Sequence, residues 1–142
     1  MIRRILRVVA EKRRQHSREL RGALTWNGLL AILHRERIPV VRTPLVRSAA
    51  LLSGGGVTVM LLNADVPGRR HLAFAAHELA HAWLHVHEGS EVCFHMDDVW
   101  PEGDAREDEA ELLATWLLGS HAVRRAFVYA ETATQLRLAL DE

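Results

Sequence analysis

The chain of 142 residues, 49% hydrophobic and 25% charged, is long enough and apolar enough to form one domain with a buried core. This composition excludes a disordered or fibrous protein. No apolar run approaches the roughly 20 residues that a membrane-spanning helix needs. The arginine-rich N-terminus lacks the apolar region of a secretory signal, and Cys93 is the only cysteine. We therefore expect a cytoplasmic protein without disulfides.

The charges are divided unevenly along the chain. Residues 1–76 carry 14 Lys and Arg against 4 Asp and Glu, whereas residues 77–142 carry 4 against 14, although the whole chain has a net charge of zero. A basic half can indicate contact with nucleic acid. We instead expect the halves to neutralise each other across one folded interface, because a dedicated nucleic-acid domain usually has net positive charge. Direct nucleic-acid binding is the less favoured alternative.

Two amphipathic helices are predicted first, as an N-terminal pair within residues 1–36. Residues at helical spacing form the apolar stripe of the first helix, with arginines on its solvated side: Ile2, Ile5, Leu6 and Val9 against Arg3, Arg4 and Arg7. Thr25 can cap the second helix. The stripe of that helix consists of Trp26, Leu29, Leu30 and Leu33, and Pro39 follows it.

Three strands are predicted next, over residues 38–43, 45–52 and 57–62, because these segments are rich in Val, Leu and Ile. The SGGG segment at 53–56 predicts a turn between the last two. These strands indicate a small, largely antiparallel sheet.

A helical pattern replaces the strands after Pro67 and Gly68. Its apolar stripe contains Leu72, Ala76, Leu79, Ala80, Trp83 and Leu84. On this helix lies an H-E-x-x-H motif, which places His77 and His81 one turn apart on the same face, close enough to chelate one ion. Glu78 lies about 100° round the helix, where it can accept a proton from a water molecule rather than bind the metal.

A zinc ion held by two histidines needs a third protein ligand, and the following helix offers several carboxylates. This helix is predicted to begin after Gly103-Asp104 and to run to Gly119, with Ala110, Leu113, Ala114 and Leu117 as its apolar stripe. Glu107 and Glu109 both lie about 80° from the core direction, on opposite sides. Asp104 and Glu107 have the spacing of a helix cap and its capping-box acid, which leaves Glu109 freer to bind metal.

Two segments carry a resemblance to a known family. NADVPGRRHLAFAAHELAHAWLH and EDEAELLATWLL resemble the ImmA/IrrE family of zinc metallopeptidases, over roughly residues 57–118. The family pattern implies that the glutamate before Ala-Asn is the third ligand, and this position is Glu109. The chain departs from the pattern at Ala80, Glu111, Leu113 and Gly119-Ser120, but no ligand position is lost.

The predicted fold is a minimal zincin-like α+β domain spanning residues 1–142. In this hypothesis His77, His81 and Glu109 hold Zn²⁺, Glu78 is the general base, and the reaction is peptide-bond hydrolysis. The resemblance implies a helix-turn-helix repressor, or a similar regulatory protein, as the substrate. The alternative is a zinc-stabilised regulatory module that binds a repressor or nucleic acid without cleaving it.

Several further residues have open roles. His85 matches the last histidine of the family's first motif, and it either contacts a ligand or packs in the core. Cys93 and His95, in the predicted loop between the two site helices, are alternative ligands. The oxyanion of peptide hydrolysis needs a donor, for which His95, His121 and Tyr129 are candidates. The strand at 57–62 is either an exposed edge that binds the substrate backbone or a buried central strand.

Overall fold

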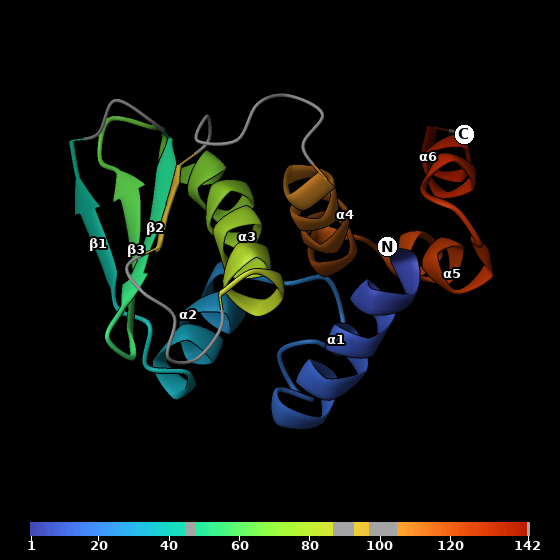
Figure 1. Ribbon diagram of the computed structural model, residues 1–142, viewed down its shortest axis with the longest axis horizontal. Helices are drawn as coiled ribbons and strands as arrows, with labels where there is room; N and C mark the ends of the chain where they lie inside the picture. The colour runs from blue at the N-terminus through green and yellow to red at the C-terminus, as the bar shows by residue number, and fades with distance from the viewer. Residues whose placement is uncertain (45–47, 87–92, 97–104, 142) are drawn as a thin grey trace.

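One four-stranded sheet and the helices packed beside it make up the computed structural model (Figure 1). The structure describes residues 1–44, 48–86, 93–96 and 105–141; for Arg69 and residues 93–96 it describes the backbone only. In chain order the elements are α1 (Ile2–Gln15), α2 (Trp26–Arg35), β1 (Val40–Thr43), β2 (Ala49–Gly54), β3 (Val57–Asn63), α3 (Gly68–Leu84), β4 (Cys93–Met96), α4 (Ala105–Leu118), α5 (His121–Tyr129) and α6 (Ala133–Asp141). The α+β fold expected of a minimal zincin-like domain is confirmed.

The sheet has the strand order β1-β3-β2-β4. β3 pairs parallel with β1 and antiparallel with β2, and β2 pairs antiparallel with β4. The tight turn between β2 and β3 places Gly55 and Gly56 at φ of 58° and 79°, a conformation that favours glycine. The expectation of a small, largely antiparallel sheet is therefore confirmed.

The structure decides between two alternatives for one strand and corrects one further expectation. β3 is a central strand, so residues 57–62 are the buried strand and not an exposed edge for substrate. The nearly continuous apolar sequence of β3 follows from this position, since Met60 and Leu62 are fully buried. Residues 93–96, expected in a loop, form β4 because their backbone pairs with β2.

α3 lies between the sheet and α4 (Figure 1). Small side chains on α3, including the fully buried Ala75, Ala76 and Ala80, allow its close approach to its neighbours. Leu51, Met60 and Leu62 of the sheet belong to the same buried cluster as Leu79 of α3 and Leu113 of α4. The motif helix is thus fixed by packing on two sides.

α1 packs against α3, α4 and α5, and its buried stripe consists of Ile2, Ile5 and Val9. Thr25 caps α2 as predicted, because its hydroxyl accepts a hydrogen bond of 3.0 Å from the Gly28 backbone N–H. Leu30 departs from the predicted stripe: it is exposed, and Ile32 is buried instead. Of the helices described, none is both long and apolar enough to cross a membrane.

The central position of β3 gives a prediction for Val59. Val59→Pro removes a backbone donor inside the sheet, so we expect the thermal midpoint to fall by 10 °C or more, or the chain not to fold, an effect of about 3 kcal/mol. Arg42→Pro in β1 is the matched control. The carbonyls of Pro39 and Thr43 accept hydrogen bonds from the Met60 and Ala64 N–H groups of the β3 side. Because backbone groups alternate in direction along a strand, the N–H of Arg42 points away from β3, and a proline there removes no bond to β3. Equal effects of the two substitutions on thermal unfolding would contradict this topology.

Candidate metal centre

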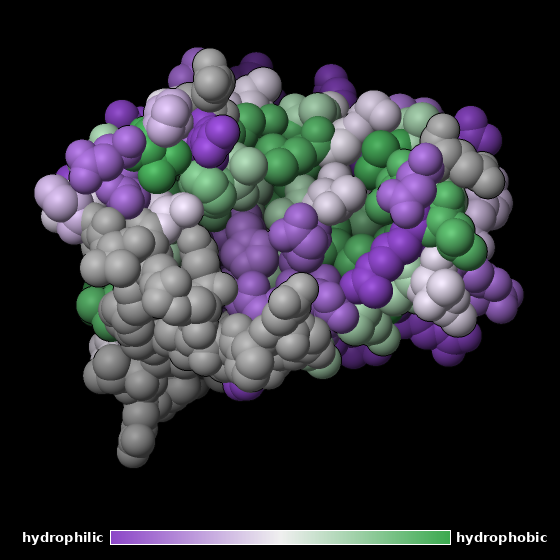
Figure 2. Space-filling model, turned by 90° about the horizontal axis from the view of Figure 1, so that it is seen from above, coloured by the Kyte–Doolittle hydropathy of each residue, from purple (hydrophilic) through white to green (hydrophobic). Residues whose placement is uncertain are grey.

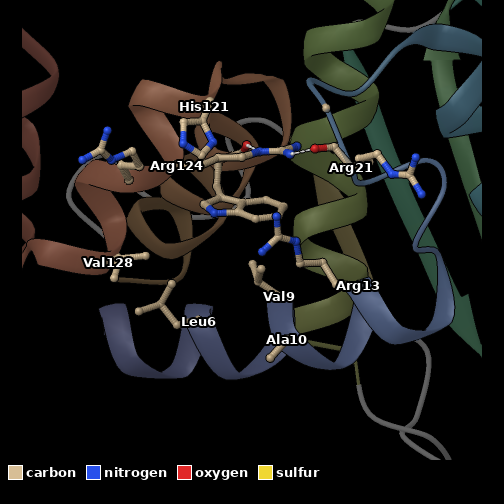
Figure 3. A pocket seen from close by; sticks show the side chains of 11 residues that line it. Leu6, Val9, Ala10, Arg13, Arg21, His121, Arg124 and Val128 are labelled. Atoms are coloured by element: carbon tan, nitrogen blue, oxygen red, sulfur yellow. Dashed lines mark hydrogen bonds between the residues drawn. The ribbon is translucent and has the colours of Figure 1, made fainter.

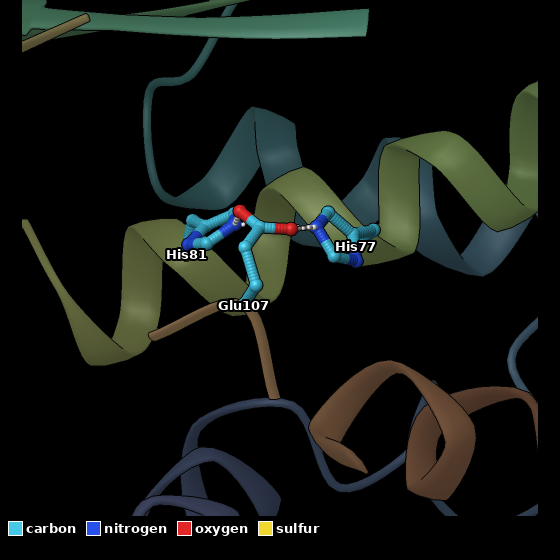
Figure 4. Close-up of side chains that lie close together, drawn as sticks. All are labelled: His77, His81 and Glu107. Atoms are coloured by element: carbon cyan, nitrogen blue, oxygen red, sulfur yellow. Dashed lines mark hydrogen bonds and ion pairs between the residues drawn. The ribbon is translucent and has the colours of Figure 1, made fainter. Parts of the chain in front are cut away.

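His77 and His81 project from one face of α3 towards α4 (Figure 4). They lie one helical turn apart, and their rings meet edge to face with centroids 4.8 Å apart. The Nε2 atoms of the two rings are 3.2 Å from each other. His81 is almost fully buried, with 1% of its surface exposed, whereas His77 is half-buried. The Nε2 atoms of both rings therefore point to one common position.

Glu107 of α4 completes this group. Its Oε1 lies 2.8 Å from His81 Nε2, and its Oε2 lies 3.1 Å from His77 Nε2, so one carboxylate oxygen faces each ring (Figure 4). Within the described part of the chain, His77, His81 and Glu107 are the group whose donor atoms converge closely enough to hold a metal ion.

The donor set fits zinc. Two imidazole nitrogens and one carboxylate oxygen are the ligands of many catalytic zinc sites, which keep a fourth position open. Zn–N and Zn–O bonds of about 2.0–2.1 Å in a tetrahedron separate the ligand atoms by about 3.3 Å. The 3.2 Å between the two Nε2 atoms and the 3.1 Å from His77 to Glu107 are close to this value. Small adjustments of these side chains would therefore accommodate the ion.

Glu111 holds the other side of the His77 ring. Its Oε2 lies 3.2 Å from His77 Nδ1, one helical turn beyond Glu107 on α4. For Nε2 to offer its lone pair to a metal, Nδ1 must carry the proton, and Glu111 is placed to accept that hydrogen bond. The carboxylate therefore selects the ring tautomer that a metal requires.

The pKa of His77 is raised to about 8 in the metal-free protein. Burial lowers this pKa, but the hydrogen bond to Glu111 and the negative charges of Glu78, Glu107 and Glu111 together outweigh it. The same contact lowers the pKa of Glu111. Protons and metal therefore compete for His77 near neutral pH.

Glu109 lies on the other flank of α4, facing α1. Its carboxylate accepts hydrogen bonds of 2.9 and 3.2 Å from Arg4, and Arg4 also bonds the Leu84 carbonyl at the end of α3. His85 Nε2 lies 3.8 Å from Glu109, while His85 Nδ1 lies 2.9 Å from Nδ1 of His81. A chain of contacts thus runs from α1 through Glu109 and His85 to the buried face of His81.

The structure differs from the sequence analysis at the third carboxylate. It brings His77 and His81 together as predicted, but it places Glu107 between them and Glu109 in an ion pair with Arg4. The physical reason is the packing of α4, which presents Glu107 and Glu111 to α3 and Glu109 to α1. The helix cap assigned to Asp104 lies outside the described residues. One feature of the sequence indicates Glu107: it lies four residues before Glu111, and this spacing matches that of the two histidines on α3.

Glu78 is buried, with 1% of its surface exposed, and its charge acts on His77. A carboxylate that is shielded from solvent beside a cationic centre suits the role of a general base. Glu78 follows His77 directly on α3, and its role as a general base stays a prediction.

A cavity of about 350 Å³ adjoins the donor group. Its polar wall contains His77, Glu107 and Glu111, and its apolar wall contains Phe74, Ala73, Ala114 and Leu118. Seen from above, the molecule has hydrophilic residues gathered in the middle of its face, between hydrophobic areas (Figure 2). An apolar side chain can therefore lie beside the polar centre.

The remaining candidates divide into two groups. His121 and Tyr129 lie on α5 and line other cavities, and Tyr129 is 76% exposed, so neither belongs to the wall described above. The side chains of Cys93 and His95 lie outside the described part of the structure, as does His87. Sequence reasoning missed Arg4, which reaches Glu109 although it was assigned to the solvated side of α1.

The fold and this centre together define a metallopeptidase-like domain. The family model of the IrrE N-terminal-like domain (Peptidase_M78) matches residues 34–134, and the chain belongs to this family. The resemblance inferred from the two motifs is thereby confirmed, and it extends beyond residues 57–118. No curated protein and no solved structure matches the chain significantly.

The contact between His77 and Glu111 gives a prediction for the metal-free protein. Glu111→Gln removes a negative charge and a strong acceptor, so the pKa of His77 should fall from about 8 towards or below its ordinary value of 6.5. Titration of the histidine ring protons by NMR measures this shift. Glu131→Gln, an exposed substitution on the loop before α6, is the control. An unchanged His77 titration in Glu111→Gln would refute the assigned contact.

Proposed function

We propose that this protein is a zinc-dependent endopeptidase. The observation that carries the proposal is the convergence of His77, His81 and Glu107, with a buried Glu78 beside them. Membership of a metallopeptidase family supports the same conclusion. A merely structural zinc site would be closed by four protein ligands, whereas this group offers three among the described side chains and adjoins a cavity.

In this mechanism His77 Nε2, His81 Nε2 and a Glu107 oxygen would hold the ion. Zinc, when bound, would polarise the scissile carbonyl and make a water molecule more acidic. Glu78 takes the proton from that water as it attacks the carbonyl carbon, and then delivers it to the amine that leaves. Glu111 keeps His77 in the required tautomer, and His85 does the same for His81.

The cavity indicates how a substrate is selected. Its apolar wall can receive an apolar side chain next to the scissile bond, and Glu107 and Glu111 keep the opposite wall negative. We propose a cytoplasmic regulatory protein as the substrate, in particular a helix-turn-helix repressor, as the family resemblance implies. Direct binding to nucleic acid is not part of this mechanism.

The third ligand can be identified by metal content. Glu107→Ala should lose most of the bound zinc because it removes an anionic ligand, whereas Glu109→Ala should retain it. Glu109→Ala should instead lower stability by about 1–3 kcal/mol, because Arg4 loses the carboxylate that it binds. Elemental analysis after gel filtration, together with thermal unfolding, measures both effects. Loss of zinc in Glu109→Ala alone would reverse our assignment.

Activity is tested with Glu78→Gln. This variant keeps the shape of the side chain but cannot accept the proton, so it should bind zinc like the parent and cleave at least 10²-fold more slowly. The substrate is a helix-turn-helix repressor encoded beside the protein, and fragments are followed by mass spectrometry. Glu131→Gln serves as the matched control.

The alternative function is a zinc-stabilised module that binds a repressor without cleaving it. Under that alternative the parent and Glu78→Gln bind the repressor equally well, and neither releases fragments. That result would exclude the peptidase proposal while leaving the metal site intact.

A further inference from the structure

A second cavity, of about 270 Å³, lies away from the donor group, between α1, the loop after it, α4 and α5 (Figure 3). Its lining has two parts. The apolar part consists of Leu6, Val9, Ala10, Val128 and Trp116, and the basic part consists of Arg13, Arg21, Arg124, Arg125 and His121, with Gly22 between them. No Asp or Glu is among these lining residues.

Arg124 is the fixed member of the basic part. It is buried, with 6% of its surface exposed, and it donates hydrogen bonds to the carbonyls of Trp116, Leu20, Arg21 and Leu117. These contacts hold its guanidinium on the Trp116 ring, at 4.1 Å from the ring centroid. Arg124 therefore contributes a positive charge that cannot move out of the cavity wall.

Arg13 approaches the same aromatic ring, at 5.2 Å from its centroid. Burial, and next to it the positive charge of Arg13, lower the pKa of Arg124, so the two guanidinium groups act on each other. Neighbouring like charges destabilise the folded state unless an anion lies near them. The cavity thus concentrates positive charge at one place.

Among the residues that the structure describes, no carboxylate forms an ion pair with the arginines of this cavity, which include Arg13, Arg21 and Arg125. The pair between Arg4 and Glu109 joins the basic and acidic halves, whereas Lys12–Glu36 and Arg35–Glu19 lie within the basic half. The ion pairs of the described residues therefore do not include Arg13, Arg21 or Arg125.

We propose that this cavity binds a small organic phosphate. A phosphate monoester carries a charge of about −1.5 to −2 at neutral pH, which suits the guanidinium groups of Arg13 and Arg124, neither of which pairs with a carboxylate within the described residues. Arginine binds phosphate oxygens in a bidentate manner. The apolar body of the ligand lies against Leu6 and Val128. Val128 is exposed in the ligand-free protein, and the bound ligand would cover it. The volume suits a compact compound rather than a polymer.

Phenyl phosphate is a suitable probe because it combines the anionic head with a compact apolar body. Isothermal titration with the full zinc-loaded chain should detect its binding, and inorganic phosphate, which lacks the body, should bind more weakly. Amide NMR shifts should move at Val9, Gly22 and His121. Shifts confined to residues around His77, or no binding at millimolar concentrations, would overturn the proposal.

Two variants locate the site. Arg13→Gln should weaken phenyl phosphate binding about tenfold, whereas Arg14→Gln, which removes the same charge from the next position of α1, should change it less than twofold. Ala10→Glu places a carboxylate in the cavity without disturbing the core, and should abolish binding. Equal losses in Arg13→Gln and Arg14→Gln would indicate a general charge effect, and parental binding by Ala10→Glu would place the probe elsewhere. Either result would overturn the proposal.

Discussion

The packing of α4 against α3 is the contact on which the candidate centre depends. α3 presents two imidazoles one turn apart, and α4 presents two carboxylates one turn apart, so the facing stripes are chemically complementary. A carboxylate and an imidazole brought together without metal form hydrogen bonds and ion pairs, which raise the pKa of His77. These side chains therefore stabilise one another without a metal, and a metal ion bound here would replace those interactions.

The opposite flank of α4 has a structural role with a functional consequence. Arg4 ties α1 both to Glu109 and to the carbonyl of Leu84, at the end of α3. Glu109 faces His85, whose Nδ1 contacts Nδ1 of His81. Because orientation of a ligating histidine depends on what its second nitrogen contacts, the position of α1 influences the centre through this chain. The N-terminal helix is thus part of the site's support, although it supplies no donor.

The sequence predicted the helices well because their apolar stripes are regular. The H-E-x-x-H motif placed His77, Glu78 and His81 on one helix, and the structure agrees. A helical wheel gives Glu107 and Glu109 the same angle from the core, so the prediction of Glu109 rested on the capping-box spacing and the family pattern. The position of each carboxylate depends instead on which neighbour packs on each flank of α4. The position of β3 was equally undetermined, because an apolar strand can be central or covered at an edge. The long-range contact of Arg4 leaves no local signal.

We propose that Glu107, and not Glu109, joins His77 and His81 in holding zinc. A crystal structure of the zinc-loaded protein, with anomalous data collected on both sides of the zinc absorption edge, tests it most directly. We expect one anomalous peak at about 2.0–2.2 Å from Nε2 of His77, Nε2 of His81 and an oxygen of Glu107, with Glu109 still bonded to Arg4. A peak coordinated by Glu109, or one held by the histidines without Glu107, would contradict it.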